Sequence, residues 1–222
     1  MMKQVILFVL LGMGWNILSA QKYTFKLNGD IINVKDGKVK LFSPTDSVNV
    51  LLGTEMKNGV FTLSGKLNEP GYYILNVAGV KFPIVMDGKD MILYGDYLAP
   101  DTKLLKGSPG VKTRLAKDRL YNQIFEEQVS DSLGRYYEMT KNGLNLSMEA
   151  EQFMMNAIQK ASRDWKEALL QFCKQHPGDL YIPLLIMKEM GKDIEWGKKA
   201  YEVLTPEIQA SQPGRLLKEM LE

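Results

Sequence analysis

The hydrophobic pattern of this chain changes its period once, and this change constrains the fold more than any other feature. Between residues 23 and 107, apolar and polar residues alternate in short runs, which is typical of strands with one buried face. After a glycine- and proline-rich cluster at 107–110, apolar residues recur at helical spacing. The sequence therefore predicts an α+β fold, in which an N-terminal antiparallel β-sandwich or open barrel (21–110) precedes an all-α segment (111–222).

Two dipeptides within the β-region predict tight turns, and the second of them predicts a hairpin. Asn58 and Gly59 both tolerate a positive φ, and Ala78-Gly79 separates two apolar runs in the same way. Pro83 has no N–H group to donate to a neighbouring strand, so its strand is expected at a sheet edge or at a bulge.

The first twenty residues predict a secretory signal peptide. Lys3 supplies a positive charge, an apolar run follows that is shorter than the roughly 20 residues of a membrane span, and Ser19-Ala20 offers a cleavage site. An uncleaved membrane anchor is the alternative. No cysteine lies near this site, so we expect no lipid attachment there and a periplasmic or envelope-associated protein.

The helical region predicts several helices with defined starts. Asp193, Thr205 before Pro206, and Ser211 are good N-cap residues. The last helix carries an apolar stripe which, if exposed, would form a partner interface. The residues of that stripe are Leu216, Leu217, Met220 and Leu221.

Composition and single residues argue against several kinds of chemistry. The net charge of +2 lacks the basic excess of a nucleic-acid binder. Cys173 is the only cysteine and His176 the only histidine, so neither a disulfide nor a closed set of metal ligands is predicted. Cys173 is expected to be a buried, inert thiol and His176 a structural residue at a helix end. We predict no catalytic residue and no cofactor.

Three further groups of residues have a structural and a functional interpretation. Four aspartates (Asp87, Asp90, Asp96 and Asp101) are expected to be turn residues and not calcium ligands, because the spacing of a calcium loop is missing. Four tyrosines (Tyr72, Tyr73, Tyr94 and Tyr97) could line a ligand-binding sheet face, but tyrosine is also common in strands. Three methionines (Met148, Met154 and Met155) are expected to belong to an adaptable core.

A set of short motifs resembles a known arrangement. In the β-region they are Phe25-x-Leu27-x-Gly29-x-Ile31, Lys38-Val39-x-Leu41, Asn58-Gly59-x-Phe61-x-Leu63-x-Gly65, Pro70-x-Tyr72 and Gly107-Ser108. These resemble the N-terminal β-domain, a domain of unknown function, of exported bacterial thiol:disulfide interchange proteins. Phe172 with Pro177, and the run from Tyr201 through Leu204, Pro206 and Ser211 to Gly214, are similar to the helical connector of those proteins.

The resemblance implies an exported protein with a docking role, and it does not imply a catalytic activity. The thioredoxin-like domain that follows the connector, and its cysteine pair, have no counterpart in this sequence. We therefore expect an exported, non-enzymatic binding or scaffold module that positions a separately encoded thioredoxin-like protein or associates with itself. The alternatives are a truncated remnant of an oxidoreductase, a ligand-binding β-sandwich protein, and an enzyme that uses carboxylates in a cleft between the domains.

Overall fold

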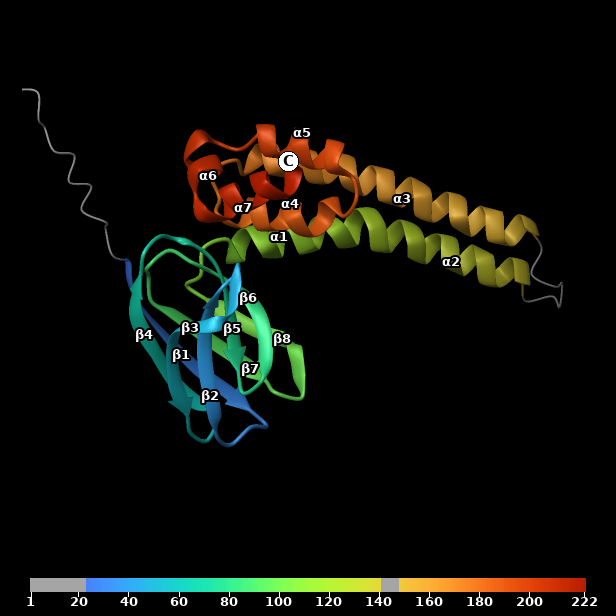
Figure 1. The fold of residues 1–222 in the computed structure, drawn as a ribbon. Helices are drawn as coiled ribbons and strands as arrows, with labels where there is room; N and C mark the ends of the chain where they lie inside the picture. The colour runs from blue at the N-terminus through green and yellow to red at the C-terminus, as the bar shows by residue number, and fades with distance from the viewer. Residues whose placement is uncertain (1–22, 141–147) are drawn as a thin grey trace, which may run out of the picture.

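The computed structural model describes residues 23–140 and 148–222, in which a β-domain is followed by a helical domain lying across one of its ends (Figure 1). The predicted signal peptide lies outside the described residues. The strands end at Lys106 and the first helix begins at Val111, on either side of the glycine- and proline-rich cluster.

The described strands form two sheets that pack face to face. One sheet has the order β4-β1-β7-β8 and the other the order β3-β2-β5-β6. Together with the helices that follow, this confirms the predicted α+β class. The strands are β1 (Tyr23–Ile32), β2 (Gly37–Ser43), β3 (Asp46–Met56), β4 (Val60–Leu67), β5 (Gly71–Val77), β6 (Val80–Met86), β7 (Met91–Asp96) and β8 (Ala99–Lys106).

The predicted turns have the backbone geometry that their residues favour. Asn58 and Gly59 have φ angles of 50° and 78°, in a tight turn that leads from β3 in one sheet to β4 in the other. Ala78 and Gly79 have φ angles of 50° and 100°, in the two-residue hairpin between β5 and β6. Pro83 lies in β6 at the edge of its sheet, as predicted.

One strand pairing departs from the antiparallel expectation. β1 and β7 run parallel, with Leu27 opposite Met91 and Ile32 opposite Asp96. Parallel neighbours need a long crossover connection. Here the chain crosses to the opposite sheet and back twice between these strands, through β2 and β3, then β4, then β5 and β6.

The core of the β-domain lies between the two sheets and is built by alternation. Along β1, Phe25, Leu27, Gly29 and Ile31 are buried while the residues between them are more exposed. In β6 the alternation ends, because Ile84, Val85 and Met86 are all buried. Ile84 and Met86 belong to the core between the sheets. Val85 belongs to neither this core nor that of the helical domain, and its burial marks the place where the helical domain covers the sheet.

The helical domain is a long hairpin with shorter helices packed on its base. Helix α3 lies beside the continuous run of α1, η1 and α2, and the end of this hairpin projects away from the rest of the molecule (Figure 1). The helices are α1 (Val111–Tyr121), the π-helical turn η1 (Asn122–Glu126), α2 (Glu127–Thr140), α3 (Met148–Gln175), α4 (Tyr181–Met190), α5 (Ile194–Glu202), α6 (Pro206–Ala210) and α7 (Gln212–Leu221).

Three predicted helix caps are confirmed. The side chains of Asp193, Thr205 and Ser211 accept hydrogen bonds from backbone N–H groups in the first turns of α5, α6 and α7. Each bond satisfies a donor that the helix start would otherwise leave free.

Candidate binding site at the domain junction

Helix α7 joins the two domains, and its two faces have different neighbours. Leu217 and Leu221 are 0% and 7% exposed and belong to the core of the helical domain. Leu216 lines a cavity at the junction, and Met220 is 51% exposed. Of the four residues predicted to form a partner interface, only these last two are therefore available at the surface.

Gln212, the first residue of α7, binds the backbone of the β-domain with both ends of its side-chain amide. Oε1 accepts a hydrogen bond from the Tyr72 N–H at 2.7 Å, and Nε2 donates one to the Tyr72 carbonyl at 2.9 Å. These groups of β5 lie beyond the last β2 pair, which joins Phe42 to Ile74. Gln212 thus continues the sheet where the neighbouring strand stops.

The close approach of Gln212 depends on the residue before Tyr72. A Cβ atom on Gly71 would stand 2.3 Å from Gln212 Oε1, which is closer than any side chain can tolerate. Glycine is therefore the residue that allows α7 to meet β5 here.

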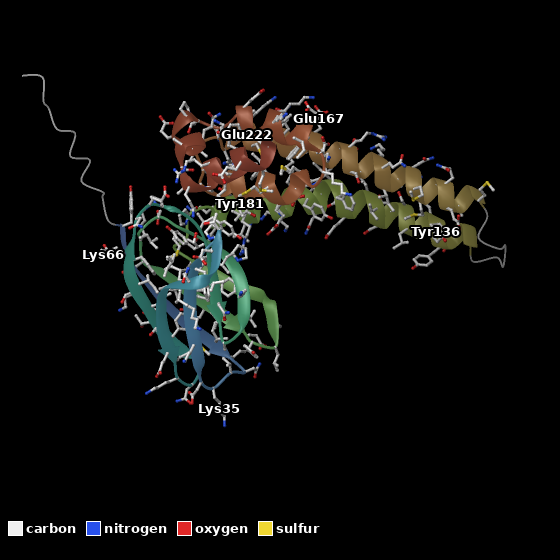
Figure 2. All side chains as sticks on the ribbon, in the orientation of Figure 1. Lys35, Lys66, Tyr136, Glu167, Tyr181 and Glu222 are labelled. Carbon is white, nitrogen blue, oxygen red and sulfur yellow. The ribbon has the colours of Figure 1, made fainter. Side chains whose placement is uncertain are left out.

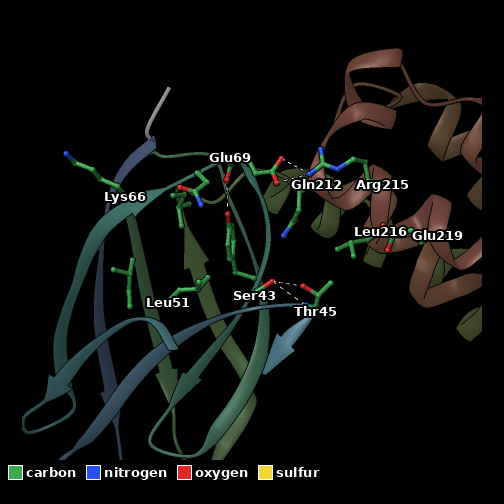
Figure 3. Close-up of a pocket in the computed structure, with 13 residues that line it drawn as sticks. Ser43, Thr45, Leu51, Lys66, Glu69, Gln212, Arg215, Leu216 and Glu219 are labelled. Atoms are coloured by element: carbon green, nitrogen blue, oxygen red, sulfur yellow. Dashed lines mark hydrogen bonds and ion pairs between the residues drawn. The ribbon is translucent and has the colours of Figure 1, made fainter. Parts of the chain in front are cut away.

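An ion pair makes a second contact between α7 and the β-domain. Arg215 Nη2 lies 2.8 and 2.9 Å from the two carboxylate oxygens of Glu69, and Nη1 donates to the Ala210 carbonyl at 2.6 Å (Figure 3). Both side chains are about half exposed, so the pair contributes no more than about 1 kcal/mol.

A cavity of about 400 Å³ opens between the β-domain and α7 (Figure 3). Its lining combines hydroxyl groups, charges of both signs and leucines. These residues include Ser43, Leu51, Lys66, Tyr73, Leu216 and Glu219. The volume lies within the range of ligand pockets in proteins, and the mixed lining offers both polar and apolar contacts.

Tyr73 is a hydrogen-bond donor at the base of this cavity. Its hydroxyl donates to the Glu69 carbonyl at 2.8 Å. Burial, together with the negative charge of Glu69, raises the pKa of Tyr73 to about 12. The phenol therefore stays protonated at physiological pH, and it acts as a fixed structural donor and not as a base.

Cys173 and His176 occupy the positions that the sequence predicted for inert residues. Cys173 is 0% exposed within the helical core, and burial raises the pKa of its thiol to about 12. The ring of His176 lies 4.6 Å from that of Phe172, measured between centroids. The thiol is thus held in its unreactive protonated form.

The predicted turn aspartates whose side chains are described bind backbone or neighbouring groups. Asp90 accepts a hydrogen bond from the Lys26 N–H at 3.0 Å, Asp96 accepts from Asn33 Nδ2 at 2.8 Å, and Asp87 pairs with Lys89. The side chain of Asp101 lies outside the described ones. Within residues 23–140 and 148–222, no group of three or more acidic, histidine or cysteine side chains is placed to hold a metal ion.

The four tyrosines do not share one face. Tyr73 packs in the core between the sheets, whereas Tyr94 is 41% exposed on an outer face beneath the ammonium group of Lys106. Tyr97 donates its hydroxyl to the Ala78 carbonyl at 3.1 Å. They therefore do not build the ligand-binding face that was one interpretation of the sequence.

The methionines of α3 are more exposed than an adaptable core would require. Met148 is 85% exposed and Met155 is 53% exposed, and only Met154 is half-buried. The expectation of core packing is therefore wrong for the first two, because they lie where the hairpin projects beyond the shorter helices.

Comparisons with known proteins identify no relative. No protein-family model, no curated protein and no solved structure matches this chain. Among the described helices, none combines the length and the apolar composition needed to cross a membrane.

The residues that build the junction could not be found from the sequence. Gln212 and Tyr72 are separated by 140 positions, and Arg215 and Glu69 by 146. The sequence did indicate that α7 starts after Ser211. No local pattern, however, indicates that the next residue, Gln212, binds the distant strand β5.

Proposed function

We propose that this protein is an exported, non-catalytic binding or scaffold module of the cell envelope, and that it holds a protein partner on the rim of the junction cavity. The resemblance to thiol:disulfide interchange proteins suggests a separately encoded thioredoxin-like protein as that partner. The observation that carries the proposal is the position of the cavity, which lies between an open sheet edge and the exposed side of α7.

The rim of the cavity has the properties of a docking surface. Strand β3 is the edge strand of its sheet, and its residues Val50 and Leu51 are 43% and 48% exposed. Leu51 lines the cavity with Leu216 of α7, and Met220 lies one turn further along the helix. An edge strand with apolar side chains offers both backbone groups and hydrophobic contacts to a partner.

The state of Cys173 supports a role in holding a partner rather than in exchange chemistry. The attacking species in thiol–disulfide exchange is the thiolate, and burial keeps this thiol protonated by raising its pKa to about 12. In a complex with a thioredoxin-like protein, the cysteine pair that exchanges electrons would belong to the partner.

Two measurements test the proposal. The isolated protein should not reduce insulin disulfides in the presence of dithiothreitol beyond the rate of dithiothreitol alone, and turnover at enzyme-like rates would reject a non-catalytic role. Affinity capture from the host envelope should retain the same protein with the wild-type chain and with the control variant Ile92→Glu, whose side chain is 39% exposed on another face of the β-domain.

The double variant Leu51→Glu, Leu216→Glu should lose that protein, because two charges would replace the apolar rim. Equal capture by this variant would place the docking surface elsewhere. Capture of nothing by the wild-type chain would contradict the scaffold role itself.

A further inference from the structure

A second cavity lies on the other side of the domain junction, between the end of β6, the segment that links the domains, and helices α1 and α4. Its volume is about 330 Å³, which is at the lower end of the range for small-molecule sites. Tyr181 at the start of α4 marks its position, where the helical domain meets the β-domain (Figure 2).

The walls of this cavity are mainly apolar and are held in place by the backbone. Val85 of β6 is buried, and its carbonyl accepts a hydrogen bond from the Ser108 hydroxyl. On α4, Tyr181, Leu184 and Lys188 recur at helical spacing and all line the cavity. Gly110 has a φ of 75°, and a Cβ atom there would stand 2.3 Å from the Cβ of Tyr181. The glycine therefore lets the linker pass close to α4.

Two cations face this apolar space without compensating carboxylates. Arg114 and Lys188 both line the cavity, and no aspartate or glutamate is among the lining residues. The Nε atom of Arg114 is buried and has no hydrogen-bond partner. A buried donor without an acceptor is costly and rare in folded proteins. Because Nε is covered by protein, an anion in the cavity would interact with the positive charge of the Arg114 guanidinium and not with Nε directly.

The nearby acids are already bound to other groups. Asp118 pairs with Lys117 at 2.6 Å, Asp179 accepts from the Thr113 hydroxyl and from the Tyr181 N–H, and Glu189 accepts from Trp165 Nε1 at 3.2 Å. Within residues 23–140 and 148–222, Lys188 makes no ion pair with a carboxylate. None of these contacts involves Arg114 or Lys188, so both cations of the lining remain available to a ligand.

Two further features at the same place bear on anion binding. The N-terminus of α1 has no side-chain cap, and its first residue Val111 lines the cavity beside Gly110. The Val111 N–H donates to the Ser108 carbonyl at 3.4 Å, so α1 favours an anion here through the positive end of its helix dipole. The hydroxyl of Tyr181 remains protonated because burial, and next the charge of Asp118, raises the pKa of Tyr181 to about 12.

We propose that this cavity binds a small amphiphilic carboxylate, of the size of a medium-chain fatty acid. The carboxylate would pair with Arg114 and Lys188, and the hydrocarbon chain would lie against Val85 and Leu184. A guanidinium group suits a carboxylate because it can donate two parallel hydrogen bonds, and the apolar walls favour the chain. The site is separate from the rim of the junction cavity, so it does not depend on the function proposed above.

Isothermal titration of the purified chain with octanoate, octanol and inorganic phosphate tests this proposal. Octanoate should bind saturably at millimolar concentration or below, and octanol and phosphate should each bind at least about tenfold more weakly, because each lacks one half of the ligand. Binding of octanol as tightly as octanoate would overturn the role of the cations. If phosphate bound as tightly as octanoate, the cavity would be a simple anion site, and the proposal that its ligand is an amphiphile would be wrong.

Variants locate the binding in the cavity. Arg114→Gln should lower the affinity for octanoate by about tenfold or more. Lys188→Gln changes an exposed position that folding tolerates, and it should lower this affinity by a smaller factor. Lys112→Gln removes an exposed charge from the same helix outside the cavity lining and should leave affinity unchanged. The proposal would be refuted if Lys112→Gln and Lys188→Gln lost the same affinity for octanoate, or if the wild-type chain did not bind octanoate.

Discussion

Replacing Gln212 by glutamate should make the attachment of α7 to the β-domain depend on pH. The amide of Gln212 donates one hydrogen bond to Tyr72 and accepts another, at 2.9 and 2.7 Å. A protonated carboxyl group can reproduce both bonds, because its O–H donates and its C=O accepts. An ionised carboxylate only accepts, so it would leave the Tyr72 carbonyl without a donor and place two acceptors against each other.

The size of the effect follows from these two bonds. A hydrogen bond contributes about 1 kcal/mol net, and a partly buried carbonyl without a donor costs about 1–3 kcal/mol. Gln212→Glu should therefore lower the free energy of unfolding by about 2–4 kcal/mol at pH 7. Gln212→Ala loses both hydrogen bonds, so it should lower the free energy of unfolding by at least about 2 kcal/mol, and this loss should be the same at every pH.

The direction of the pH dependence is set by the charged form. Because the ionised carboxylate is disfavoured at this place, the pKa of Glu at position 212 should be raised in the folded state above its usual value of about 4.3. Such a group stabilises the fold fully below the unfolded pKa, and this stabilisation is lost as the pH rises through the folded pKa. The deficit of Gln212→Glu relative to wild type should thus nearly vanish at pH 4.

Urea unfolding followed by tryptophan fluorescence measures this deficit. Trp165 and Trp196 both belong to the helical core, so their emission reports the domain that Gln212 attaches. Gln159→Glu, at an exposed position of α3, controls for the added negative charge. If Gln212→Glu showed the same deficit at pH 4 and pH 7, or matched Gln159→Glu at both, the pairing of Gln212 with Tyr72 would not stabilise the protein.

Three further predictions concern single positions. Gly71→Ala should lower the free energy of unfolding by about 1–3 kcal/mol in the same urea assay, because the new Cβ would lie 2.3 Å from Gln212 Oε1. An unchanged urea midpoint would contradict this prediction. Cys173 should react with a thiol reagent only as fast as the helical domain unfolds, since it is 0% exposed; labelling at the rate of a free peptide thiol would show otherwise. Thr205→Ala should lower the free energy of unfolding by about 1 kcal/mol, because it removes the cap of α6. Thermal unfolding followed by circular dichroism should show a lower Tm, and an unchanged Tm would contradict this prediction.

The sequence predicted the local structure of the β-domain because that structure has local causes. A strand with one buried face must alternate, and Asn58-Gly59 is favoured in a hairpin whatever lies around it. The order of strands in a sheet has no such local cause. Nothing in the alternation of β1 distinguishes a parallel from an antiparallel neighbour, so its pairing with β7 could not be predicted.

The face that α1 buries could not be predicted either. Leu115, Leu120 and Ile124 recur near helical spacing, yet Leu115 is 44% exposed while Lys117 is buried. The ammonium group of Lys117 pairs with Asp118 and lies 5.9 Å from the centre of the Tyr121 ring. A lysine can thus bury its aliphatic part and satisfy its charge at the surface of a core, which a hydrophobic pattern does not reveal.

The two domains are held together at two separate places, and this limits how they can move. On one side Gln212 of α7 binds the backbone of Tyr72 in β5, and on the other Ser108 binds the carbonyl of Val85 in β6, next to the start of α1. Tyr72 and Val85 lie opposite each other in the ladder that pairs β5 with β6. Because both attachments use one pair of strands, a rotation of the helical domain must break one of them or distort the ladder. The hairpin of α2 and α3 is therefore expected to keep a fixed direction relative to the sheets.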